Sequence, residues 1–319
     1  MNGSEAHRAV TRNPLYLFSI LCVFILSSIV TLPTSCLPAQ TAKSSQDAHL
    51  AMQRLTLYDT RSNFTKCRNA AASGDVKAMY ALGGLYEHGE NAEKDLSKAW
   101  YWYRRSAHMG SLQGMNRLGE MYRNGDGVAR GYDKAKFWWN RAAQQGSSDA
   151  MNNLGSLYSY QRGFPSNYGV ALDWFRRSAK RGNAEAMNNL GLMYFEAHGV
   201  PRDYVMARHW FENSVERKSS SAMVDLGFMY QNGLSVPKDI EKATGLYESA
   251  VAAGSIQGPT MLALLYKNGI GVPKDIEKAR EDFEKAADLN DVGAMYELGE
   301  LYEGLSGYPR DAEIGRAHV

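Results

Sequence analysis

The chain has 319 residues, with 36 Lys and Arg against 34 Asp and Glu, which gives a formal net charge of +2. A charge this close to zero provides no general argument for a nucleic-acid partner, and we predict none. The three cysteines, Cys22, Cys36 and Cys67, are too few for a scaffold held together by disulfides.

The N-terminal part reads as a targeting or anchoring region. Residues 1–14 are a polar segment that contains Arg8 and Arg12, and residues 15–32 are an uncharged apolar run. We expect residues 15–39 to be either a cleaved signal peptide or an uncleaved signal anchor, because the run is just long enough to cross a bilayer. The two arginines favour a cytoplasmic N-terminus, so in both cases the repeats described below would lie across the membrane.

Two details of this region leave the processing open. Cleavage is plausible between Ser35 and Ala42, after the prolines and small residues that follow the apolar run. Cys36 also permits a lipoprotein interpretation, although Pro33 stands where a leucine is expected. We therefore expect an exported or membrane-anchored protein, with its repeats in the lumen of the endoplasmic reticulum, the extracellular space or a bacterial periplasm. The sequence does not choose between a bacterial and a eukaryotic source.

Residues 40–58 are predicted to be a linker followed by a capping helix, and residues 59–311 to be a repeat array. Seven segments share one pattern at a spacing of 36 residues without insertions. A leucine column marks them: Leu82, Leu118, Leu154, Leu190, Leu226, Leu262 and Leu298. A fixed period of this length is typical of a solenoid, in which each unit buries its apolar face against its neighbours.

Each repeat carries start signals for two helices. The first helix is predicted to begin at a column of polar capping residues: Asp75, Ser111, Ser147, Asn183, Ser219, Ser255 and Asp291. The second helix is predicted to begin at a second column of polar caps, with Gly131 as the weak cap in one repeat: Asp95, Gly131, Asn167, Asp203, Asp239, Asp275 and Asp311. An aromatic column in the second helix, which includes Tyr103, Trp139 and Phe175, is interpreted as core.

The C-terminal residues 312–319 are predicted to be a non-native tail. Ile314–Val319 (IGRAHV) is what a common sequencing-adapter oligonucleotide encodes, and the repeat register fails at Gly315. We therefore expect the natural chain to continue beyond this point.

The repeat as a whole resembles the Sel1-like repeat, a relative of the tetratricopeptide repeat. Its pattern A-x-x-x-L-G-x-x-Y-x-x-G-x-G-V-x-x-D-x-x-K-A-x-x-W is well represented by Gly125, Gly127, Val128, Lys134 and Ala135. The resemblance implies an all-α fold, a right-handed superhelix of about seven αα-hairpins. It implies little about function, because this family consists of adaptors with unrelated partners.

No catalytic or metal-binding motif is present in the sequence. There is no HExxH, GxSxG or phosphate-binding loop, and no Cys/His cluster has the spacing of metal ligands. We predict no catalytic residue, no metal and no cofactor.

The informative surface is the side of the first helix that lies opposite its core columns. By analogy with tetratricopeptide solenoids, this side lines the concave groove. An asparagine ladder there leads into an apolar patch, and we predict that these residues bind a partner: Asn116, Asn152, Asn188, Leu192, Phe195, Val224, Phe228 and Leu264. The alternative is that a tightly wound superhelix packs the same side chains against the next repeat.

The sequence thus favours a non-enzymatic scaffold that binds a protein or peptide outside the cytoplasm. A narrower alternative is a component of the ubiquitin-ligase complex in endoplasmic-reticulum-associated degradation, because the chain resembles its luminal Sel1-like adaptor. A further alternative is an enzyme whose catalytic domain follows the present C-terminus. Residues 15–32 could also attach the protein to a membrane.

Overall fold

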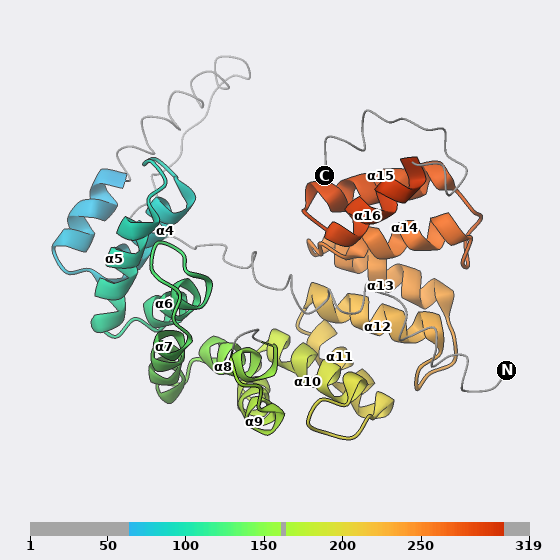
Figure 1. The fold of residues 1–319 in the computed structure, drawn as a ribbon, viewed down its shortest axis with the longest axis horizontal. Helices are drawn as coiled ribbons and strands as arrows, with labels where there is room; N and C mark the ends of the chain where they lie inside the picture. Colours follow the sequence, from blue (N-terminus) through green and yellow to red (C-terminus); the bar gives the residue numbers. More distant parts are fainter. Residues whose placement is uncertain (1–63, 161–163, 303–319) are drawn as a thin grey trace, which may run out of the picture. The chain divides into compact units, whose positions relative to one another are not determined.

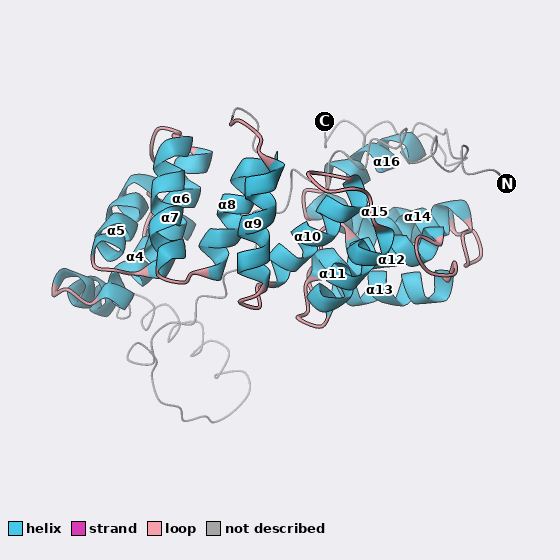
Figure 2. Cartoon of the chain, turned by 90° about the horizontal axis from the view of Figure 1, so that it is seen from below, coloured by secondary structure: helices cyan, strands magenta, loops and turns pink. Residues whose placement is uncertain are grey.

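The computed structural model describes residues 64–160 and 164–302, and all regular structure within these ranges is helical. The all-α prediction is confirmed (Figure 2). The expected signal or anchor region, the linker and capping helix at 40–58 and the tail at 312–319 lie outside the described residues. Among the helices that are described, none is both long and apolar enough to cross a membrane.

The helices alternate between the two positions of the repeat (Figure 1). After a helical stretch at 64–72, the first helices of successive repeats are α4 (Val76–His88), α6 (Leu112–Asn124), α8 (Ser148–Tyr160), α10 (Ala184–Glu196), α12 (Ser220–Asn232), α14 (Gly258–Asn268) and α16 (Val292–Tyr302). The second helices are α5 (Leu96–His108), α7 (Tyr132–Gln144), α9 (Tyr168–Ala179), α11 (Tyr204–Val215), α13 (Ile240–Ala252) and α15 (Ile276–Asp288).

The chain divides into two compact units. The N-terminal unit contains α4–α8, and the C-terminal unit contains α9–α16. Within each unit, a first helix packs against the second helix of its own repeat and against the second helix of the preceding one. This nearest-neighbour packing is what the repeat predicts for a helical-hairpin solenoid.

The predicted caps are present. Asp75 Oδ1 accepts hydrogen bonds from the backbone N–H groups of Lys77, at 2.9 Å, and Ala78, at 3.0 Å. Asp95, Ser111 and Asn183 accept equivalent bonds at the starts of their helices. Two helices differ from this pattern. Helix α7 has no side-chain cap at Gly131. Helix α14 begins only at Gly258, with a proline in its first turn, although Ser255 Oγ accepts a 3.0 Å bond from the Gly258 N–H.

The core is built from the aromatic column of the second helices and from a column of small residues in the first helices: Gly83, Gly119, Gly155, Gly191, Gly227, Ala263 and Gly299. Trp139, Phe175 and Tyr247 are fully buried. A Cβ atom added to Gly119 would lie 2.2 Å from Nε1 of Trp139, and one added to Gly191 would lie 2.4 Å from the ring of Phe211. At Gly119 and Gly191 a side chain would therefore collide with the aromatic ring of the paired helix, whereas the repeat with Ala263 accommodates a buried methyl group in the same column. Cys67, which the repeat register places in the aromatic column, is also buried.

Candidate interaction face

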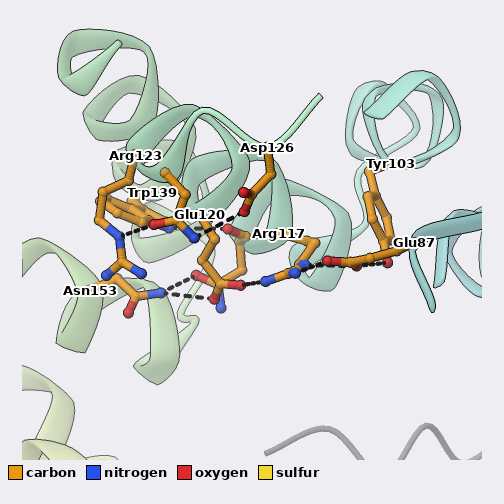
Figure 3. A network of polar contacts seen from close by, with 10 residues as sticks. Glu87, Tyr103, Arg117, Glu120, Arg123, Asp126, Trp139 and Asn153 are labelled. Carbon is orange, nitrogen blue, oxygen red and sulfur yellow. Dashed lines mark hydrogen bonds and ion pairs between the residues drawn. The ribbon is translucent and has the colours of Figure 1, made fainter. Parts of the chain in front are cut away.

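The four columns headed by Tyr80, Ala81, Gly84 and Glu87 lie on one side of the first helices, and we call this side the first-helix face. In the N-terminal unit it carries a polar network (Figure 3). The Glu87 carboxylate accepts hydrogen bonds from Tyr103 Oη, at 2.8 Å, and from Arg117 Nε, at 3.0 Å. Arg117 also forms an ion pair with Glu120. Because Arg117 lies on α6 and Glu87 on α4, these contacts join neighbouring repeats.

The network continues to α8 through Asn153. Its Nδ2 donates to Asn116 Oδ1, at 3.0 Å, and to Glu120 Oε1, at 3.4 Å. The backbone oxygen of Asn116 accepts a bond of 3.1 Å from Trp139 Nε1, which ties the network to the aromatic core. Figure 3 shows Glu87, Arg117, Glu120 and Asn153 following one another in a row that crosses the neighbouring first helices.

Arg123 lies at the end of this row, above the aromatic ring of Trp139 in the core. Its guanidinium lies 5.9 Å from the centre of the Trp139 ring, and its Nε donates to Asn124 Oδ1 at 3.1 Å. Burial lowers the pKa of Arg123, although nearby Glu120 acts in the opposite direction. The carboxylates, amides and guanidinium groups of this row thus already have partners within the protein.

In the C-terminal unit the column headed by Gly84 is apolar on three successive first helices. Leu192, Phe228 and Leu264 occupy one column on α10, α12 and α14, and all three are half-buried. Phe195 lies beneath them, with its ring centre 6.2 Å from that of Phe228 and 6.5 Å from that of Phe211. Phe195 and Val224 are members of the core cluster. The column therefore forms a half-exposed apolar row above a packed core.

The expected exposure of the eight candidate residues was wrong for half of them. Asn152, Asn188, Phe195 and Val224 are buried, with exposed fractions of 7%, 4%, 6% and 7%. Asn116 is half-buried, like the three members of the apolar row. The physical reason is that successive first helices touch along this side, as α10, α12 and α14 do. This is the packing that the alternative interpretation anticipated, and a binding role for the eight residues stays a prediction.

One half-buried acid on this face, Asp225, was not among the candidates. Asp225 accepts a hydrogen bond of 3.1 Å from Asn188 Nδ2. Burial of this carboxyl raises its pKa to about 7, with a smaller contribution in the same direction from Glu196 and Glu185. Asn188 Oδ1 lacks a hydrogen-bond donor within the described structure. A protonated Asp225 has an O–H group that can donate to this oxygen.

The sequence could have indicated the ion pairs between adjacent first helices, which were not predicted. Glu87 and Arg117 are 30 residues apart, and Lys267 and Glu297 show the same separation with a 2.6 Å ion pair. Opposite charges at this offset would mark contacts between adjacent first helices. The described ranges contain no group of three or more His, Cys, Asp or Glu side chains that could hold a metal ion.

Comparisons with known proteins support the repeat assignment. The Sel1 repeat matches seven segments, at residues 76–111, 112–147, 148–183, 184–219, 220–255, 260–291 and 292–318. Among curated proteins, no sequence matches the chain.

Three solved structures illustrate the fold similarity. A protective antigen of uropathogenic Escherichia coli, which displays an SLR fold, is 34% identical with a TM-score of 0.57, and the match covers 78% of this chain and 53% of the antigen. The chain thus spans about half of that protein's length. A Sel1 repeat protein from Oxalobacter formigenes is 27% identical with a TM-score of 0.63, covering 76% of this chain and 97% of the other. An immunity protein from Pseudomonas aeruginosa shares the fold at 15% identity and a TM-score of 0.53, covering 69% and 84%.

Proposed function

The chain belongs to the Sel1 repeat family, and from this premise we propose that it is a non-enzymatic scaffold that binds a protein or peptide on its first-helix face. The observation that carries the proposal is the apolar row of Leu192, Phe228 and Leu264. These side chains are half-buried on three successive first helices, of which α10 contacts α12 and α12 contacts α14. A partner that covers them would remove apolar surface from water, which is the main driving force of such association.

The apolar row contributes more to binding in this proposal than the polar network does. Glu87, Arg117 and Asn153 already have hydrogen-bond partners. A partner would have to replace these bonds, and exchanging one satisfied bond for another yields little free energy. We therefore propose a partner segment with apolar side chains.

We further propose that the repeats act outside the cytoplasm. The support is the apolar run at residues 15–32 with arginines on its N-terminal side. A membrane attachment through this run is part of the proposal. The narrower version, an adaptor of the ubiquitin-ligase complex of the endoplasmic reticulum, rests on resemblance alone. The bacterial origin of the two neighbours with 34% and 27% identity favours a bacterial periplasm instead.

Replacement of Leu192 and Leu264 by asparagine tests the apolar row. Both residues are half-buried, so the fold should persist while the row loses its apolar character. We expect the double variant to lose the partners that the unaltered chain retains in pull-downs from its native host. Val205→Asn is the matched control, because Val205 is 58% exposed on a second helix and should leave recovery unchanged. Unchanged recovery with the double variant, at an unchanged melting temperature, would remove the row from the binding site.

A further inference from the structure

One column of the second helices points outward and changes character along the chain. It reads Tyr101, Phe137, Asp173, His209, Gly245 and Glu281. Tyr101 is 50% exposed and Phe137 is 58% exposed. Because the other four repeats build the same helix with small, polar or charged residues in this column, the fold does not require an aromatic ring there. Large exposed rings that the fold does not need are typical of an interaction surface.

Basic groups flank the two exposed rings. On α5, Arg105 lies 5.4 Å from the centre of the Trp102 ring, and on α7, Arg141 lies 5.8 Å from that of Trp138. The two helix surfaces are joined, since His108 of α5 packs edge-on against Trp138 at 5.3 Å. Stacking on an indole holds a guanidinium in place while its N–H edge stays free to meet a carboxylate. We call this surface of α5 and α7 the aromatic-basic face.

The outward side of α13 has the complementary character. Gly245 in its middle and Ala252 at its end are small, and Glu241 and Glu248 lie beside them; all four are exposed, as is Lys242 next to Glu241. A Cβ atom added to Gly245 would meet no other atom within 4 Å, so this stretch of helix is uncovered and flat in the described structure. We call it the small-acidic face.

We propose that this protein self-associates, with the aromatic-basic face of one copy docked on the small-acidic face of a second copy. The rings of Tyr101 and Phe137 would cover the uncovered strip of α13, and Arg105 and Arg141 would meet the glutamates beside it. Projecting rings thus oppose small residues, and guanidinium groups oppose carboxylates.

The charge pairs in such a contact act mainly on orientation and on salt dependence. Exposed ion pairs each contribute little free energy and are screened by salt, whereas the covered aromatic area is not. The association should therefore weaken with salt and also depend on the two rings.

Sedimentation velocity on the full chain tests the proposal directly. We expect association that increases with protein concentration and weakens between low and high salt. Arg105→Glu with Arg141→Glu should lower the association constant by at least about tenfold, and so should Glu241→Lys with Glu248→Lys. An equimolar mixture of the two double variants should associate again, because each then presents the charges that the other lacks. This recovery also shows that neither variant is misfolded.

The aromatic contribution has its own control in the same column. Tyr101→Ser with Phe137→Ser should reduce association, while Asp173→Ser should not. Three outcomes would overturn the proposal: a wild-type chain that stays monomeric at all concentrations, association that is unaffected by either charge reversal, or a mixture of the reversed variants that fails to associate.

Discussion

A pair of adjacent glycines in α4 provides a sharp test of how the repeats pack. Gly83 faces the Tyr103 ring of α5, and a Cβ atom added there would lie 2.6 Å from a ring carbon. A Cβ atom added to Gly84 would lie 3.6 Å from the Tyr103 hydroxyl, which is an ordinary contact. The substitutions Gly83→Ala and Gly84→Ala therefore differ mainly in the collision with Tyr103, although Gly83 is also the more buried of the two.

The ring of Tyr103 has little freedom to move away. It is 2% exposed, and its hydroxyl donates to Glu87 at 2.8 Å, while the same carboxylate holds Arg117. Both alanines gain the same helix propensity, about 0.5–1 kcal/mol. This gain cancels in the comparison, so the difference in the free energy of unfolding is the cost of overpacking, about 1–3 kcal/mol.

Thermal unfolding followed by circular dichroism measures this difference. One kcal/mol corresponds to a shift of about 2–4 °C in a domain of this size. We expect Gly84→Ala to melt at or above the wild-type temperature and Gly83→Ala to melt below it. In hydrogen-exchange measurements, the backbone amides of α4 and α5 should exchange faster in Gly83→Ala than in the wild type. Equal melting temperatures for the two variants would refute the packing of Tyr103 against Gly83.

Two further predictions concern the C-terminal unit. The pKa of Asp225 is raised to about 7 in the folded state, whereas an unfolded chain releases this proton near pH 4. The free energy of unfolding should therefore decrease as the pH rises from about 4 to about 7. Chemical unfolding across this range should show the decrease in the wild type and a smaller decrease in Asp225→Asn. Ala197 ends α10 in the left-handed region, with φ of 65°. Other repeats have a glycine at this position: Gly89, Gly125, Gly233 and Gly269. Ala197→Gly should therefore stabilise the protein by about 1 kcal/mol, and a lower midpoint of unfolding would contradict this reasoning.

The repeat register predicted the helices because local chemistry and the global fold agree in them. Asp75 and Asp95 cap the helices that they were expected to cap, and Leu82 and Tyr103 are core. Lys218 stands directly before the cap Ser219, where the other repeats have a glycine or Asn290, and it adopts the same left-handed conformation, with φ of 63°. In these cases, a short-range signal was sufficient.

The first-helix face could not be predicted to the same degree. Helical periodicity shows which side of a single helix is opposite its core columns, but not how closely the next repeat approaches that side. Phe195 and Asn188 lie on the predicted side and are nevertheless buried, because adjacent first helices meet there. Exposure in a solenoid depends on the rotation between successive repeats, and this rotation is a property of the stacked array.

A site-specific photo-crosslinking experiment tests the central claim, that the first-helix face of this scaffold binds its partner. A photoreactive residue at Leu192 would probe the apolar row, and the same residue at Val205, 58% exposed on α11, would probe a second helix of the same unit. In the native host, we predict a defined protein adduct from position 192 and none from position 205. Adducts from position 205 alone, or from neither position, would contradict the account.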